Sequence, residues 1–376
     1  MEPRRRPSAR LRSLLAGSTV LTLALLSACA RRTPEPWEEV HLGTDARFSG
    51  IWFTDSLNGW IAGGAREVAG GMLGRTRDGG RTWRIESGIV PGTAAGLGLN
   101  GIVFRDTARG CVVTSDGSIH SSSDGGRSWR ATRTGRSPGD GLAHLQLLGE
   151  LDGWAIGPAS IVGTRDGGET WTVRARNTLE TGYLSGNAVA FTDDSHGWLV
   201  RHAGVLMRTY DGGTTWTRVG LTLPPGAAPT LWDVTFVNAD QGWLVGDEGT
   251  IFHTSNGGES WQRQIEGVPV ERVLARGERP RPPDIVPGLD GGPSRLSLTA
   301  VRFADPERGF ALGSYADAGE SVVLGTRNGG ETWRTEHVAP GQHLHALFVL
   351  DRMHAWAVGD RVRERPQVLV RYRGTP

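Results

Sequence analysis

Short apolar runs recur along the chain at nearly constant intervals, with polar, Gly-rich segments between them. Most runs end shortly before a Gly-aromatic step such as "NGWIAGG" or "QGWLVGDEG". Runs of β-branched and aromatic residues bounded by Gly-rich turns predict short β-strands, about four in each repeating unit. Six apolar residues each stand six positions before the Gly of such a step: Phe53, Phe104, Leu147, Phe191, Phe236 and Phe303.

The repeating unit also contains an eight-residue phrase that occurs six times. The copies are "TRDGGRTW" (76–83), "SSDGGRSW" (122–129), "TRDGGETW" (164–171), "TYDGGTTW" (209–216), "TSNGGESW" (254–261) and "TRNGGETW" (326–333). Their spacings are 46, 42, 45, 45 and 72 residues. Regular repetition near 45 residues with four strands per unit predicts an all-β fold, a β-propeller of four-stranded antiparallel blades.

The phrase resembles the Asp-box, or BNR, repeat, which occupies the hairpin between the third and fourth strands of a blade. Its Asp or Asn accepts hydrogen bonds within the turn, and its Gly pair permits positive φ. The Trp should pack between blades. Each turn supplies one carboxylate at most, so we expect neither a calcium site nor another metal or cofactor. The turn residues are Asp78, Asp124, Asp166, Asp211, Asn256 and Asn328, followed by Trp83, Trp129, Trp171, Trp216, Trp261 and Trp333.

Six boxes do not fix the number of blades. After the last box, 344–360 repeats the first two strands, and "PQVLVRYRG" (366–374) supplies a third. The missing Trp-led fourth strand matches "PWEEVHL" (36–42). We therefore predict seven blades within 36–376, closed by the N-terminal strand, with six blades as the alternative.

The N-terminus has the pattern of an export signal. A basic segment precedes "LLAGSTVLTLALL", which is too short to span a bilayer comfortably. The following "LSAC" resembles the lipobox of bacterial lipoproteins, which implies cleavage after residue 28 and lipid attachment at Cys29, with 29–35 as a linker. Ordinary secretory cleavage near Ala28 or Ala30 is the alternative. The expected location is an inner or outer membrane surface facing the periplasm or exterior.

Charge makes one class of partner unexpected, and the cysteine content excludes an intrachain disulfide. Loss of residues 1–28, which contain five Arg and one Glu, changes the formal net charge from +1 to −3, so nucleic acid is not an expected partner. With Cys29 lipidated, only Cys111 remains and no intrachain disulfide can form. We expect a monomer.

Strand order places the box turns on one face and the loops between strands two and three, and between blades, on the other. The second face has the variable lengths, including the Pro- and Arg-rich stretch 267–296, which we expect to be a surface insert. This face is the candidate binding surface. Its candidate residues are Arg66, Glu67, Arg201, His202, Asp247, Asp317, Arg361 and Arg363.

The full unit, with "GWLVGDEGTIFHTSNGGESW" (242–261) as its clearest copy, resembles the photosystem II assembly and stability factor family over Trp37 to Arg373. The resemblance implies a seven-bladed propeller that binds protein partners during assembly of a membrane complex, without catalysis. The alternatives are an exported sialidase-like glycoside hydrolase and a carbohydrate-binding propeller. The Arg-Ile-Pro signature of sialidases is absent, and only four Tyr are present.

Overall fold

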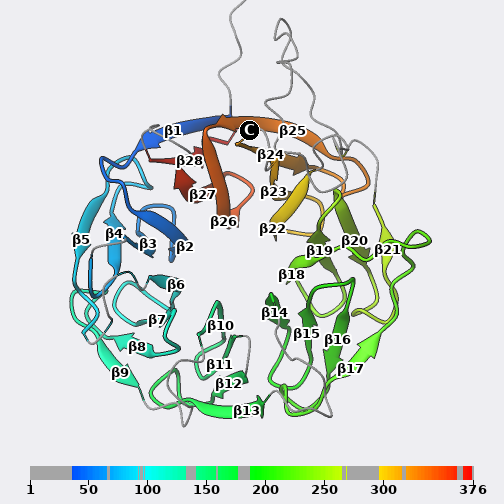
Figure 1. Cartoon of the computed structure of the whole chain (residues 1–376), viewed down its shortest axis with the longest axis horizontal. Helices are drawn as coiled ribbons and strands as arrows, with labels where there is room; N and C mark the ends of the chain where they lie inside the picture. Colours follow the sequence, from blue (N-terminus) through cyan, green and yellow to red (C-terminus); the bar gives the residue numbers. More distant parts are fainter. Residues whose placement is uncertain are drawn as a thin grey trace, which may run out of the picture. The chain divides into compact units, whose positions relative to one another are not determined.

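The computed structural model places seven four-stranded antiparallel sheets around a central axis (Figure 1). It describes residues 36–65, 68–91, 93, 96, 98–132, 141–157, 160–176, 187–264, 268, 296–315, 319–361 and 367–374. Each sheet is one blade, and its first strand lies nearest the axis. The predicted seven-bladed propeller is therefore confirmed. Among the described residues, no helix has the length and hydrophobicity required to traverse a bilayer.

Blades one to six each contain four consecutive strands. In blade one these are β2 (Arg47–Phe53), β3 (Gly59–Gly64), β4 (Met72–Thr76) and β5 (Arg84–Ser87). In blade two they are β6 (Leu99–Phe104), β7 (Gly110–Thr114), β8 (Ile119–Ser122) and β9 (Arg130–Thr132). In blade three they are β10 (His144–Leu148), β11 (Asp152–Ile156), β12 (Ser160–Thr164) and β13 (Thr172–Arg176).

The same order continues around the ring. Blade four contains β14 (Ala188–Phe191), β15 (Gly197–Val200), β16 (Leu206–Thr209) and β17 (Thr217–Val219). Blade five contains β18 (Leu231–Phe236), β19 (Gly242–Gly246), β20 (Thr250–Thr254) and β21 (Gln262–Arg263). Blade six contains β22 (Ser297–Phe303), β23 (Gly309–Tyr315), β24 (Glu320–Thr326) and β25 (Arg334–Pro340).

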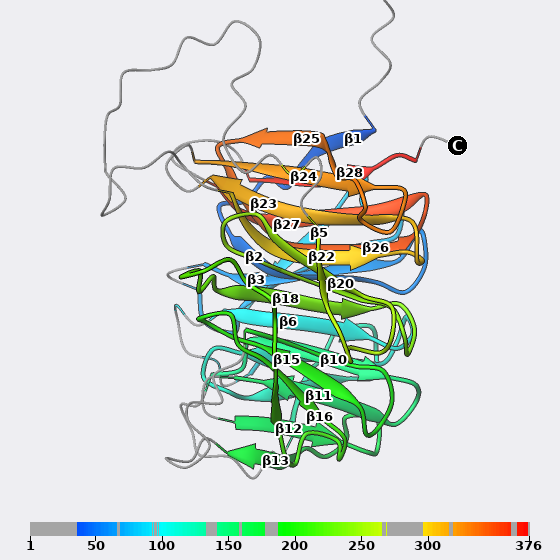
Figure 2. The ribbon, with the colours of Figure 1, turned by 90° about the vertical axis from the view of Figure 1, so that its right-hand side faces the viewer.

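Blade seven joins the two ends of the propeller chain. It contains β26 (Gln342–Asp351), β27 (His354–Arg361), β28 (Val368–Tyr372) and, as its outer strand, β1 (Trp37–His41). The register pairs Trp37 with Tyr372 and His41 with Val368. Trp37 is 2% exposed, and its ring meets Phe310 of blade six edge-on at 5.2 Å. The N-terminal strand thus closes the ring as predicted, and the side view in Figure 2 shows β1 beside β28.

Aromatic stacks between blades explain the Gly-Trp step. The Trp at the start of a second strand stacks on the Phe of the next blade's first strand, as Trp60 does on Phe104 at 3.9 Å. Equivalent stacks join Trp154 to Phe191, Trp198 to Phe236, Trp243 to Phe303 and Trp356 to Phe53.

The Gly of the step is needed because the Phe ring of the paired strand lies over it. A Cβ at Gly59 would overlap Phe53, its pairing partner. In blade seven the smaller Val349 stands opposite Ala355, so a methyl group fits there. The small residue at the Gly position of the repeat is therefore required by packing within each blade.

Candidate functional site

The box turns lie on one face of the ring, here called the box face, together with the turns between first and second strands. Gly79 donates its amide to the carbonyl of Leu57, which joins the two kinds of turn in blade one at 2.9 Å. Asp124 shows the local chemistry of a box. Its carboxylate accepts hydrogen bonds from the Ser122 and Ser128 hydroxyls and from the amides of Arg127 and Ser128.

These bonds set the charge state of the box carboxylates. Partial burial alone would raise the pKa of Asp124, but the bonds from Ser128, Ser122 and Arg127 outweigh it and hold the pKa at about 2. The pKa values of Asp78, Asp166 and Asp211 are lowered for the same reason. In the fifth and sixth boxes, Asn256 and Asn328 accept the same amide bonds through Oδ1. The six turn residues are therefore occupied in holding their own turns.

The boxes also hold adjacent blades together. Trp60 of blade one donates its indole N–H to the carbonyl of Gly125 in the box of blade two, at 3.1 Å. The same bond occurs at three further seams, as we call the contacts between adjacent blades: Trp154 to Gly212, Trp243 to Gly329 and Trp356 to Gly79. Five of the box Trp residues lie edge-on to the strand-one Phe ring of their own blade, as Trp129 does to Phe104. The sequence did not indicate these inter-blade bonds.

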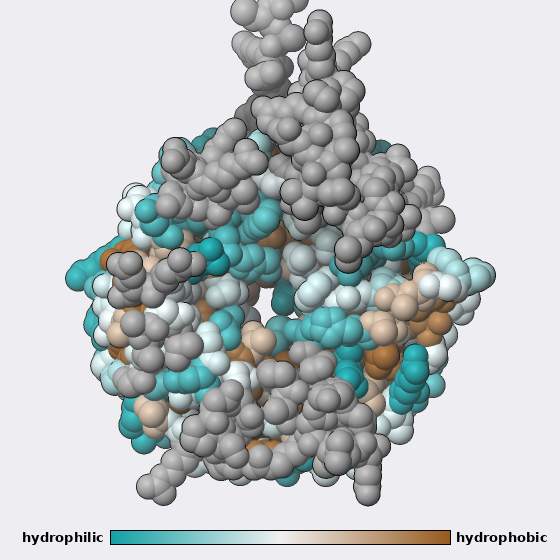
Figure 3. Space-filling model, viewed as in Figure 1, coloured by the Kyte–Doolittle hydropathy of each residue, from teal (hydrophilic) through white to brown (hydrophobic). Residues whose placement is uncertain are grey.

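A channel of about 350 Å³ runs along the axis, lined by the first strands of all seven blades. It opens at the centre of the space-filling view (Figure 3). In five blades a β-bulge in the first strand turns one residue into the channel. These residues are Ser49, Asn100, Trp232, Thr299 and His345. Four lie four positions before the strand's Phe, so a repeat alignment could have found them.

Several polar groups in the channel wall bond to the next blade. Ser49 donates to the carbonyl of Leu99, Asn100 to that of Leu142 and Asn187 to that of Leu231. These bonds give backbone carbonyls of the next blade a side-chain donor. The polar ring therefore fastens blades to one another around the axis.

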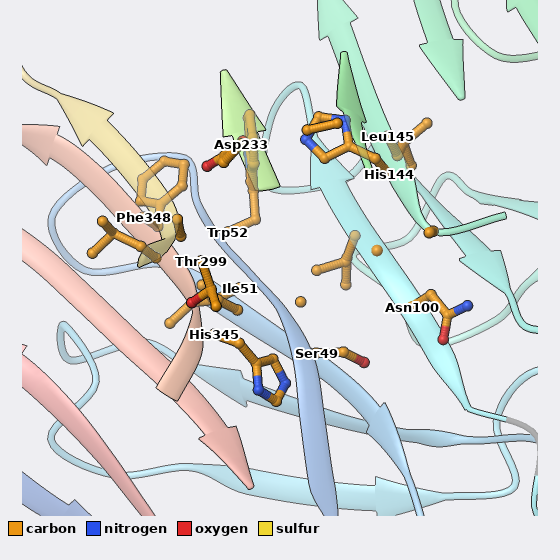
Figure 4. Close-up of a pocket in the computed structure, with 18 of the residues that line it drawn as sticks. Ser49, Ile51, Trp52, Asn100, His144, Leu145, Asp233, Thr299, His345 and Phe348 are labelled. Atoms are coloured by element: carbon orange, nitrogen blue, oxygen red, sulfur yellow. The ribbon is translucent and has the colours of Figure 1, made fainter. Parts of the chain in front are cut away.

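A charged pair, Asp233 and Arg302, is among the described residues that line the channel. Asp233 accepts the amide of Val301 at 2.9 Å and pairs with the guanidinium of Arg302. His144 faces this pair (Figure 4). Burial lowers the pKa of His144 to about 4, while the Asp233 charge opposes and the Arg302 charge reinforces that shift. His144 is therefore neutral at pH 7, and its Nδ1 and the Thr299 hydroxyl are buried without a partner among the described atoms.

The face opposite the boxes holds the candidate binding residues. Asp247 is fully engaged there, since it accepts the Trp232 indole at 2.7 Å, the Ser297 hydroxyl at 2.6 Å and the Thr230 amide at 3.3 Å. His202 lies edge-on to Trp232 at 6.0 Å, with its Nδ1 3.4 Å from the Thr230 hydroxyl. These three residues thus form one group at the channel mouth between blades four and five.

Other candidates are placed apart or lie outside the described residues. Arg201 contacts the sulfur of Met207 at 3.9 Å, and burial lowers its pKa. Cys29, Arg66, Glu67, Asp317, Arg363 and the side chain of Arg361 are not described. Of the insert 267–296, only Val268 and Leu296 are described, and both are buried between blades five and six. Cys111 is also buried, which raises the pKa of its thiol to about 12. Among the described residues, no group of three or more His, Cys, Asp or Glu could hold a metal ion.

The fold and these turns define an Asp-box propeller whose repeat residues serve blade packing. The family model of the photosynthesis system II assembly factor YCF48 matches residues 142–231 and 223–273. The photosystem II assembly lipoprotein Ycf48 of Picosynechococcus sp. is 32% identical over 242 residues, which cover 52% of this chain and 67% of that relative. The chain belongs to the Ycf48 family. A second Ycf48 lipoprotein, from Synechococcus sp., is 29% identical over 40% of this chain and 45% of the relative.

Solved structures agree on the fold. YCF48 bound to D1 peptide has a TM-score of 0.66 at 18% identity, covering 90% of this chain and 96% of that chain. YCF48 from Cyanidioschyzon merolae has a TM-score of 0.63 at 17% identity, covering 89% and 98%. A GH74 xyloglucanase from Xanthomonas campestris has a TM-score of 0.54 at 14% identity, covering 88% and 55%. At these identities the likeness concerns architecture alone.

Proposed function

We propose that this chain is a membrane-anchored, non-catalytic propeller that binds a protein partner during assembly or stabilisation of a membrane complex. Family membership is the observation that carries the proposal. Curated relatives are named photosystem II assembly lipoproteins, and a propeller of the same family has been solved with a D1 peptide. Under this proposal, the partner of this chain is likewise bound through a peptide segment.

The chemistry of the channel favours binding over hydrolysis. Glycoside hydrolysis generally needs two carboxyl groups about 5–10 Å apart, one of them free to carry a proton. Asp233 is the one carboxylate among the residues that line the channel, and it is held by Arg302 and the Val301 amide. The box carboxylates are likewise tied to their own turns. A non-catalytic role uses the described residues as they stand.

Anchoring follows from the lipobox at 26–29, with 1–28 as signal peptide and 29–35 as linker. A diacylated Cys29 would hold the propeller at a membrane surface without a spanning helix. Cys29→Ser should abolish acylation and move the protein from the membrane fraction to the soluble fraction. The control is the buried Cys111→Ser, which should fractionate like the parent. Membrane association of Cys29→Ser equal to that of the parent would contradict the anchor.

The partner is expected on the face opposite the boxes, because that face carries the variable loops and the exposed His202 beside Trp232. The test is pull-down from detergent-solubilised native membranes with the full chain and with a variant in which a short Gly/Ser link replaces 269–294, so that the buried Val268 is kept. Loss of a partner in a variant with unchanged thermal unfolding would support the assignment. Retention of every partner would show that the insert is passive.

A further inference from the structure

One position recurs at the tip of the turn between first and second strands in every blade. Around the ring from blade one to blade seven it is occupied by Leu57, Ala108, Leu151, Ser195, Asp240, Glu307 and Met353. In blades one to six, its carbonyl accepts the amide of the first box glycine at 2.8–3.0 Å. The backbone at these tips is therefore held in the same way. Their side chains stand at one level on the box face and are free to differ.

These seven side chains divide the box face into two halves. Four consecutive blades, seven, one, two and three, carry Met353, Leu57, Ala108 and Leu151, whereas blades four, five and six carry Ser, Asp and Glu. Leu57 is 51% exposed, Leu151 57% and Met353 38%. A scattered exposed Leu needs no explanation, but apolar residues at equivalent tips of adjacent blades form a coherent surface.

Charge follows the same division. Exposed arginines surround the apolar tips, namely Arg77 and Arg81 in blade one, Arg127 in blade two and Arg165 in blade three. In the polar half, two of the tips, Asp240 and Glu307, are themselves acids. Further exposed acids lie near the tips, namely Asp193 and Asp194 in blade four, Glu259 in blade five and Glu331 in blade six. The exceptions include Glu150 and Glu169 in blade three, of which Glu150 pairs with Arg109 of blade two at 3.7 Å, and Arg327 in blade six. Apolar tips among arginines match an anionic lipid surface, whereas the acidic half is repelled by one.

The chain enters the propeller beside the apolar half. Pro36 accepts the amide of Arg373 at 2.7 Å, and Gly374 lies against Met353, so β1 begins at the box face of blade seven. Cys29 stands seven residues before Pro36, and seven residues span at most about 25 Å. An acyl chain on Cys29 would therefore keep this edge of the box face close to the membrane.

We propose that the box-face half formed by blades seven, one, two and three rests on an anionic bilayer, with Leu57, Leu151 and Met353 entering the headgroup region. This inference builds on the lipid anchor of the proposed function and adds the orientation of the propeller. The box face points to the membrane, and the opposite face, with its variable loops, points away from it toward the protein partner.

The test uses the acylated full chain in vesicles of phosphatidylethanolamine and phosphatidylglycerol containing a nitroxide-labelled lipid. A polarity-sensitive fluorophore is attached to one introduced cysteine at a time, Leu57→Cys or Met353→Cys. The matched controls are Asp240→Cys, at the same tip in the acidic half, and Ala228→Cys, on the opposite face. Cys111 remains unlabelled because it is buried. We expect a blue shift and several-fold stronger quenching at 57 and 353 than at 240 and 228.

The outcomes separate the orientation from the anchor. If the protein floats with the vesicles and all four labels stay in water, the anchor stands and the bilayer contact is wrong. If the controls are quenched as strongly as 57 and 353, the orientation is wrong. A chain that fails to float with the vesicles overturns both. Shielding of 57 and 353 only after addition of solubilised membrane proteins would assign this half to a protein partner and overturn the bilayer contact.

Discussion

At the residue scale, the most repeated side chains of this protein act on their own backbone. Asp124 receives four hydrogen bonds from within its box, and Trp60 and Asn100 each donate to a carbonyl of the next blade. Repetition in the sequence thus marks the residues that hold the ring together. The residues that distinguish one blade from another, such as Leu57 and Glu307 on the box face, are the ones available for contacts outside the propeller.

Asp124→Ala should destabilise the propeller, because two backbone amides and two hydroxyls lose their acceptor. The expected loss is about 1–2 kcal/mol of unfolding free energy, as for removal of a capping side chain. Asp124→Asn is the matched control, since Asn256 and Asn328 serve the same role in other boxes. Urea unfolding of both variants measures the difference. Equal midpoints for Ala and Asn would show that the side-chain acceptor is dispensable.

At the element scale, each blade is a local unit, but two seams depart from the common Trp–Phe stack. Between blades two and three, Cys111 and Leu147 replace Trp and Phe. Between blades six and seven, Arg308 pairs with Glu336 and donates to the Tyr372 hydroxyl at 3.0 Å. Phe310 and Trp37 complete this second seam. Ring closure therefore has its own set of contacts, of which those to Trp37 and Tyr372 depend on β1 and β28.

Removal of residues 1–43 should destabilise the propeller by several kcal/mol, out of a total of about 5–15 kcal/mol for a domain. The cut would expose the edge of β28 and remove Trp37 from the blade six–seven seam. The control is removal of 1–35, which leaves β1 intact. The measurement is the thermal transition temperature of each truncated protein, which should be lower for the variant that lacks β1. Identical transition temperatures would contradict a structural role for β1.

Sequence reasoning found what is local and repeated. The strand-one Phe, the Gly-Trp step and the box each lie within one blade, so six copies were enough to predict the blade, and the unmatched "PWEEVHL" predicted the closure. Contacts between blades were harder to predict from the sequence, because they join distant residues. The bond from Asn100 to Leu142, for example, joins residues 42 apart. Nothing in the local sequence showed that Asp247 accepts hydrogen bonds from Trp232 and Ser297 and is therefore not free for a partner.

At the scale of the whole molecule, the buried neutral His144 and the hydrogen-bonded box carboxylates predict that acid lowers the free energy of unfolding in two stages. His144 has a pKa of about 4 in the fold against 6.5 when unfolded, so the unfolded chain binds more protons between these values. Stability should therefore fall as pH drops from 6.5 to 4. The box carboxylates have lowered pKa values, so their contribution is present above about pH 4 and is lost as pH falls towards 2.

Thermal unfolding across pH measures both stages. His144→Asn should reduce the decline between pH 6.5 and 4 and leave the decline below pH 4 unchanged. The Asp124→Asn variant should do the opposite, because it removes one of the tied carboxylates. A His144→Asn profile parallel to that of the parent throughout would show that this histidine is not held neutral by the fold.

The closure of blade seven has a consequence for how the protein is made. β1 is the first described strand of the propeller to leave the ribosome, and β28, with which it pairs, is the last. The six other blades can form in turn from neighbouring strands, while β1 waits with an open edge until residue 372 has been synthesised. Completion of the ring is therefore a late, long-range step. A chain that is stopped early carries two unpaired edges, which makes it a target for aggregation or proteolysis.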